Sequence, residues 1–273
     1  MKSFLNLIMH PVRFLMNRSR AVIAVALLLT FSFFWIAPAY AQTATLTPRQ
    51  VVEYALTLEK LEADFYRRAV AETQNGRLSS VPEIAKAALV SYGQDEAQHV
   101  INLSAVLSSI GGNPDAIQLP ANPNYSAILG RDPFANPTDL LLAGQYVEDL
   151  GVAAYKGQVQ NLLAAGEAGK AVLAGALEIH SVEARHAAGI RYLRQTLLGT
   201  NVQPWINNPK SVIYNEDRSG SLIPFNSAAF DGYATETEVL ALVKPILMNQ
   251  QSNAAPNSTS GAEPAQTSVQ GLW

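Results

Sequence analysis

Hydrophobic residues recur at spacings of three and four along several long stretches of the chain, a pattern typical of helices that bury one face. We expect such helices at 47–72, 80–110, 138–165 and 170–198, and a shorter one at 236–248. No stretch shows sustained alternation of apolar and polar residues, so we expect almost no β-sheet. The sequence therefore predicts an all-α protein.

The lengths of the connections predict how these helices are arranged. Short turns join the first helix to the second and the third to the fourth, and short turns make antiparallel neighbours. The connection 111–137 between the two hairpins is long enough to cross a whole bundle. One long crossover between two hairpins is the ferritin-like connectivity, so we expect a four-helix bundle over 47–199. A long loop and the short helix follow at 200–249, and the composition of 250–273 predicts a disordered tail.

The first 41 residues have the pattern of a secretory signal peptide, followed by a linker at 42–46. Basic residues without any acidic residue accompany an uncharged apolar run at 21–36, and Ala39 and Ala41 suit a cleavage site. The alternative is an uncleaved membrane anchor, although a run of 16 residues is short for a span. We therefore expect export to a periplasm, a lumen or the medium, with no stable membrane anchor once the signal is cleaved.

The net charge argues against one class of partner, and the lack of cysteine excludes one kind of cross-link. The chain has 19 basic and 22 acidic residues, and it becomes more acidic without its first 41 residues. An acidic chain with no basic cluster argues against nucleic acid as a partner. The chain has no cysteine, which excludes disulfides. The sequence is compatible with a homodimer and does not determine the oligomeric state.

Two of the predicted helices carry the same pair of potential metal ligands. Glu96 and His99 lie three residues apart on the second helix, as Glu183 and His186 do on the fourth. Residues three apart share one side of a helix, so each pair can bind one metal ion. At about 100° per residue both pairs project onto apolar faces. Unpaired carboxylates buried there would cost several kcal/mol each, and bound cations would offset that cost.

The other two long helices each offer a glutamate on the core-facing side. Glu59 lies at the centre of the apolar face of the first helix, with Glu62 one turn further on at its edge. Glu148 lies on the apolar face of the third helix. A weak internal repeat relates the two halves, because Glu59 and Glu148 are each followed seven residues later by a tyrosine, Tyr66 or Tyr155. Each tyrosine can hydrogen-bond the ligand of the opposite helix.

Some residues near this set admit two interpretations. The repeat favours Glu59 over Glu62 as a ligand, and Glu62 is either a ligand or a partner of an outer arginine or tyrosine. Tyr92, like the two repeat tyrosines, either hydrogen-bonds a ligand or is a core aromatic residue. His180 projects away from the direction of its neighbouring ligands, which favours a flank or surface position. Asp149 projects outward, away from the core.

The quoted motifs resemble those of the ferritin-like superfamily, which includes bacterioferritin, rubrerythrin and manganese catalase. More narrowly, the segments 54–66, 148–155 and 183–186 resemble the secreted ferritin-like domain family related to plant desiccation-related proteins. The resemblance covers about 47–198 and implies a centre of two iron or manganese ions. In bacterioferritin and rubrerythrin the first-helix ligand is also followed seven residues later by tyrosine, which favours Glu59. The long loops depart from cage-forming ferritins and argue against a storage shell.

The resemblance implies an oxidoreductase of ferroxidase, peroxidase or catalase type, whose metals react with oxygen or peroxide in stress protection. Two alternatives stay open: a stress protein that binds metal without turnover, and a structural desiccation-related protein. Carboxylate and imidazole ligands do not discriminate between iron and manganese. The expected ligands come from all four long helices and comprise Glu59, Glu62, Glu96, His99, Glu148, Glu183 and His186.

Overall fold

The computed structural model describes residues 46–207 and 230–248. The predicted signal peptide at 1–41 and the predicted tail at 250–273 lie outside the described residues. Within the described part the chain is helical, with no β-strand, as the hydrophobic pattern predicts. None of the described helices is long and apolar enough to cross a membrane.

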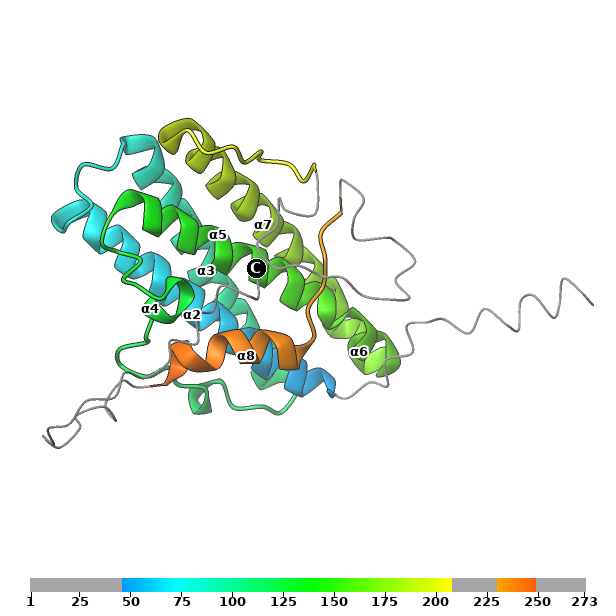
Figure 1. Ribbon diagram of the computed structural model, residues 1–273. Coiled ribbons are helices and arrows are strands. Elements are labelled where there is room, and N and C mark those ends of the chain that lie inside the picture. The colour runs from blue at the N-terminus through cyan, green and yellow to red at the C-terminus, as the bar shows by residue number, and fades with distance from the viewer. Residues whose placement is uncertain (1–45, 208–229, 249–273) are drawn as a thin grey trace, which may run out of the picture. The chain divides into compact units, whose positions relative to one another are not determined.

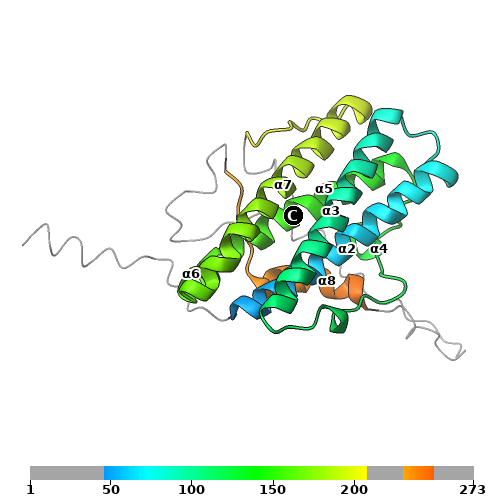
Figure 2. The ribbon, with the colours of Figure 1, turned by 180° about the vertical axis from the view of Figure 1, so that it is seen from behind.

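Four long helices form the predicted bundle of two hairpins (Figure 1). The first hairpin consists of α2 (Pro48–Asn75) and α3 (Glu83–Ser109), which pack against each other. The second consists of α5 (Pro137–Gly157) and α7 (Glu167–Leu198), which also pack together. Seen from behind, α3 and α7 lie on the same side of the bundle (Figure 2). The predicted ferritin-like connectivity is therefore confirmed.

The crossover between the hairpins carries two short helical turns, η1 (Pro114–Ala116) and α4 (Ser126–Leu129). The Lys60 ammonium of α2 donates hydrogen bonds to the carbonyl oxygens of Pro114 and Ile117, at 3.1 and 2.6 Å. Tyr125 donates its hydroxyl hydrogen to the backbone oxygen of Leu61, at 2.9 Å. The polar outer side of α2 therefore fastens the crossover to the bundle.

The third long helix is interrupted, whereas the sequence predicted one continuous helix to residue 165. It ends at Gly157, and α6 (Val159–Ala164) follows after Gln158. The backbone N–H of Ala234 donates a hydrogen bond to the carbonyl of Ala153, the partner that Gly157 would have in a regular helix. The segment before the last helix therefore contacts α5 directly before the interruption, a contact that local periodicity does not reveal.

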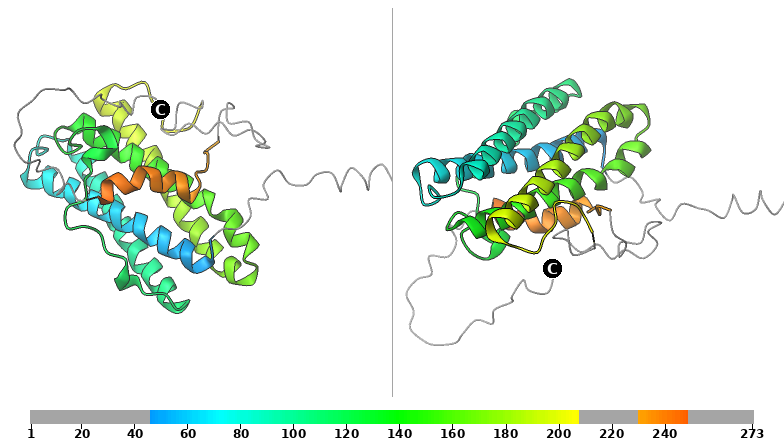
Figure 3. Two further views of the ribbon diagram at one scale, coloured as in Figure 1. Left: turned by 60° about the horizontal axis from the view of Figure 1, so that its bottom comes forward. Right: turned by 90° about the horizontal axis from the view of Figure 1, so that it is seen from above.

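The short predicted helix is present as α8 (Glu236–Leu247), which lies across the bundle next to α4 and α5 (Figure 3). Thr235 starts it with a capping box, because its hydroxyl accepts the N–H of Glu238 and the Glu238 carboxylate accepts the N–H of Thr235. Val239, Val243 and Ile246 form its buried face. Their spacing of four and three residues matches one side of a helix.

The apolar core divides into two clusters along the bundle. One contains Phe65 and Ile190, and the other contains Leu56, Leu107 and Ile179. Along α3 and α7, members of one cluster precede the predicted ligands in sequence and members of the other follow them. The predicted ligands therefore form a polar layer between two apolar layers.

Asp139 fastens the start of α5 to the crossover, and its replacement should cost stability. Its carboxylate accepts hydrogen bonds from Arg131, at 2.6 Å, and from the side chain of Asn136, at 2.8 Å. The hydrogen bond from Arg131 holds the pKa of Asp139 below its ordinary value, although burial opposes this. We expect Asp139→Asn to lower the free energy of unfolding at neutral pH by about 1 kcal/mol.

The pH dependence of this effect follows from the lowered pKa. The stabilisation is present above the unfolded-state pKa of about 4 and is lost as the pH falls through the lower folded-state pKa. Thermal melts at a series of pH values should therefore show the Asp139→Asn protein and the unmodified protein converging in acid. A difference that persists unchanged to about pH 2 would contradict this assignment.

Candidate metal centre

All seven predicted ligands are buried in the middle of the bundle. The two on α2 and the two on α3 face those on α5 and α7, so each long helix contributes at least one. The exposed fraction is 0% for the four innermost carboxylates and at most 7% for the others. The innermost carboxylates are Glu59, Glu96, Glu148 and Glu183.

Four donor residues surround each of two potential cation positions. At the first, His99 Nδ1 lies 3.1 Å from Glu59 Oε2 and 2.9 Å from Glu96 Oε2. Glu183 Oε1 lies 3.4 Å from the same nitrogen. One ligand atom from each of these four residues lies within 4.8 Å of the others, a spacing that could hold one metal ion. We call this group the His99 set.

The second group, which we call the His186 set, consists of Glu96, Glu148, Glu183 and His186. His186 Nδ1 lies 2.8 Å from Glu96 Oε1 and 3.5 Å from Glu148 Oε2. Glu96 and Glu183 belong to both sets, whereas the other members belong to one set each. The two sets therefore overlap at two carboxylates, and each set could hold a metal ion.

Two buried tyrosines hold the unshared glutamates. Tyr66 of α2 donates its hydroxyl hydrogen to Glu148 of α5, and Tyr155 of α5 donates to Glu59 of α2. Burial and the neighbouring glutamates raise the pKa of both tyrosines well above the ordinary value, so both hydroxyls remain donors. The reciprocal pairing places each tyrosine on the ligand of the opposite helix, as the internal repeat predicts.

Without a metal, the two histidines carry the compensating charge. Burial lowers the pKa of His99 and of His186, but the close carboxylates of the surrounding glutamates outweigh it and raise each pKa to about 10. Burial raises the pKa of Glu96, but the nearby ring nitrogens of both histidines outweigh it and lower that pKa to about 2. Burial and the neighbouring glutamates raise the pKa of Glu183 well above the ordinary value. Clustered carboxylates thus oppose the ionisation of Glu183, and a cation would relieve this repulsion.

Several buried oxygens in this layer are suited to a cation. Both carboxylate oxygens of Glu183, Oε2 of Glu148 and Oε2 of Glu62 accept no hydrogen bond. Buried polar atoms are normally paired, so unpaired oxygens that face one another indicate a site for a bound group. A Cβ atom at Gly151 would lie 3.1 Å from Glu62 Oε1 and 3.2 Å from Glu183 Oε2, so glycine leaves room for these carboxylates. The donor set fits divalent iron or manganese.

Glu62 lies beside the two sets but belongs to neither. It is buried, and neither an arginine nor a tyrosine of the described residues hydrogen-bonds it. Its role as a ligand stays a prediction. His180, whose Nδ1 lies 3.1 Å from the backbone oxygen of Val152, is half-buried and belongs to neither set.

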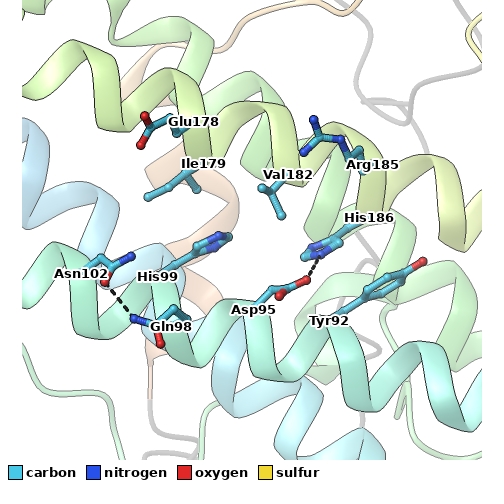
Figure 4. A pocket seen from close by; sticks show the side chains of 10 residues that line it. All are labelled: Tyr92, Asp95, Gln98, His99, Asn102, Glu178, Ile179, Val182, Arg185 and His186. Carbon is cyan, nitrogen blue, oxygen red and sulfur yellow. Dashed lines mark hydrogen bonds and ion pairs between the residues drawn. The ribbon is translucent and has the colours of Figure 1, made fainter.

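A cleft between α3 and α7, with a volume of about 520 Å³, reaches the two histidines (Figure 4). Tyr92 lines this cleft and stacks on the ring of His186, with ring centroids 4.3 Å apart. Tyr92 therefore contacts a predicted ligand without hydrogen-bonding a carboxylate of either set. The exposed rim contains Gln98, Glu178 and Arg185.

Sequence reasoning missed two residues near the centre. Asp149 was expected to point outward, which is wrong: it is 1% exposed and forms an ion pair with Arg191 between α5 and α7. Asp95 was not considered, although its Oδ2 lies 3.1 Å from His186 Nε2. The position of Asp95 directly before Glu96 was the only sequence signal, and it does not reveal a contact with another helix.

Residues 47–196 match the family model described as the ferritin-like domain. Because the match covers more than half of the chain, the protein belongs to this family. No curated protein and no solved structure matches the chain. The family and the buried acidic and histidine residues agree on a ferritin-like bundle with a candidate metal site.

Proposed function

We propose that the protein binds two iron or manganese ions and acts as an oxidoreductase on oxygen or peroxide. The observation that supports this most directly is the sharing of Glu96 and Glu183 by two four-residue donor sets. Shared carboxylates between two adjacent positions suit a pair of ions rather than a single one. The unpaired oxygens of Glu183 support the same interpretation.

Each donor would have a distinct task in this centre. Glu96 and Glu183 would contribute to holding both ions, His99 and Glu59 would hold one ion, and Glu148 and His186 would hold the other. Bound iron or manganese would supply redox chemistry with oxygen species, which the side chains of this site do not provide. The tyrosines would keep the unshared glutamates oriented, since hydrogen-bonded outer partners fix ligand geometry.

The surroundings would control access to the ions. The two apolar clusters flank the polar layer. The cleft between α3 and α7 is open to solvent at Gln98 and Arg185 and reaches both histidines. A molecule as small as oxygen or peroxide could approach the layer along this route.

Export and a role in stress protection are further parts of the proposal. They rest on the signal-peptide pattern of 1–41 and on the resemblance to secreted, desiccation-related ferritin-like proteins. Mass spectrometry of the protein from its native compartment tests the first part. An N-terminus at Gln42 would support cleavage, and an intact Met1 would contradict it.

The metal content is the first test of the proposed function. We expect purified metal-free protein to take up two equivalents of Mn²⁺ or Fe²⁺ per chain, measured by elemental analysis after removal of unbound metal. Because the ions bind the folded state, its melting temperature should rise, by the equivalent of about 2.7 kcal/mol at a metal concentration 100 times the Kd. Uptake of less than one equivalent would contradict the proposal.

A structural or purely metal-binding role is the second candidate. The observation that favours a structural role is the pairing of both histidines with glutamates, which balances charge in the layer without metal. A structural bundle would melt at the same temperature with and without metal. A metal-binding protein without turnover would take up two equivalents but consume peroxide and oxidise ferrous ions no faster than free metal does.

A further inference from the structure

The internal repeat relates α3 to α7 and allows the two histidines to be compared. His99 and His186 are 87 positions apart, and the same offset relates Asp95 to Val182 and Tyr92 to Ile179. Each set contains one histidine and three glutamates. The glutamate that belongs to only one set accepts a hydrogen bond from a tyrosine in both cases. The residues that surround the outer edges of the histidine rings are not alike.

The outer edge of His186 has polar and aromatic partners from α3. Its Nε2 lies 3.1 Å from Asp95 Oδ2, and its ring stacks on Tyr92 at an interplanar angle of 29°. Its Nδ1 faces the glutamates of the His186 set. A carboxylate that accepts the outer N–H of a ligand histidine fixes the ring orientation and raises the basicity of the inner nitrogen.

The outer edge of His99 lacks such partners. Apolar Ile179 and Val182 of α7 lie across the cleft from it (Figure 4). All its polar contacts within the described residues are made by Nδ1, which faces the glutamates of the His99 set. Its Nε2 therefore has no carboxylate to orient it.

Resting on the proposed dinuclear centre, we propose that the two positions are unequal and that Asp95 is the positioning residue responsible. The position of the His186 set binds its ion first and more tightly. The position of the His99 set binds its ion second and more weakly.

Titration of the metal-free protein with Mn²⁺ and with Co²⁺ tests this inequality. Calorimetry should resolve two steps whose dissociation constants differ by about tenfold or more, and Co²⁺ absorption should follow each step. We expect Asp95→Ala to weaken the first step by about tenfold, the low end for outer-sphere partners because Asp95 is half exposed. The two steps should then merge. Asp95→Asn keeps an acceptor oxygen and should recover part of the loss.

A second variant tests the same idea from the other side of the cleft. Val182→Asp places a carboxylate at the repeat-related position and should strengthen the second step without changing the first. Gln98→Glu is the matched control, because it adds one negative charge to the cleft rim at a residue that hydrogen-bonds Asn102 and neither histidine. It should leave the ratio of the two dissociation constants unchanged.

The outcomes separate this inference from the proposed function. Two ions bound with equal affinity, or an Asp95→Ala variant that weakens both steps equally, would overturn the inequality and leave the dinuclear centre intact. An equal response to Gln98→Glu and Val182→Asp would overturn it as well, since charge alone would then explain the gain. A protein that binds no metal would overturn both.

Discussion

Glu183→Gln should abolish metal binding at both positions, whereas Glu59→Gln should weaken binding at only one. Glu183 contributes an oxygen to both donor sets, and Glu59 contributes to the His99 set alone. A neutral amide oxygen is a poor substitute for a carboxylate toward a hard divalent cation. We expect Glu183→Gln to lower both affinities by more than about 100-fold, beyond the 10–100-fold typical of outer-sphere partners.

The comparison is controlled because both glutamates are fully buried and both replacements keep the side-chain volume. Elemental analysis should give close to zero equivalents for Glu183→Gln and close to one for Glu59→Gln. Retention of one tightly bound ion in Glu183→Gln would contradict the shared role of this carboxylate. Equal losses in the two variants would show that the sets are not arranged as the geometry indicates.

Without metal, the Glu183→Gln protein should be as stable as the unmodified protein or more stable, although its metal affinity falls. Burial and four neighbouring glutamates raise the pKa of Glu183 well above its ordinary value, which means that its ionised form is disfavoured in the folded protein. Replacing it by a neutral amide of the same shape should leave the melting temperature of the metal-free bundle equal or higher. The rise in melting temperature that metal confers should be absent. These paired measurements distinguish a lost ligand from a damaged fold.

Gly157→Ala should destabilise the protein strongly while leaving the ligands in place. A Cβ atom at Gly157 would lie 1.8 Å from the backbone oxygen of Ala234. The clash would push the segment before α8 away from α5 and disturb the hydrogen bond from Ala234 to Ala153. Overpacking of this kind costs about 1–3 kcal/mol, and we expect the upper end because the clash is with backbone. For a chain of this size each kcal/mol lowers the melting temperature by about 2–4 °C.

Gly175→Ala provides the matched control in the neighbouring helix. Gly175 lies within α7, and a Cβ atom there would meet nothing within 4 Å. Alanine in a helix interior is favoured over glycine by up to about 1 kcal/mol, so this variant should melt at the same or a higher temperature. Gly157→Ala should still bind two ions, because α8 contributes no member of either donor set. A loss of metal in Gly157→Ala alone would show that α8 supports the centre.

The sequence by itself determined the helices and most of the candidate ligands. Helical periodicity and capping are local, so Thr47 and Pro48 predict the start of α2, and the pairs Glu96–His99 and Glu183–His186 predict ligands on one side of a helix. The internal repeat also offered the exchange of tyrosine hydrogen bonds between α2 and α5 as one of two interpretations, and the structure shows that exchange. Each of these features depends on spacing along one helix or on similarity between two segments.

The tertiary structure alone decided which residues meet between helices. A projection of α5 by itself places Asp149 on the outside, but α7 covers that flank and pairs Asp149 with Arg191. The last turn of α5 before the break at Gln158 contacts Ala234, which is far away in sequence. Glu183 belongs to both sets, and Asp95 contacts His186, because α3 and α7 lie close together. The spacing of residues along either helix does not determine how close the two helices lie.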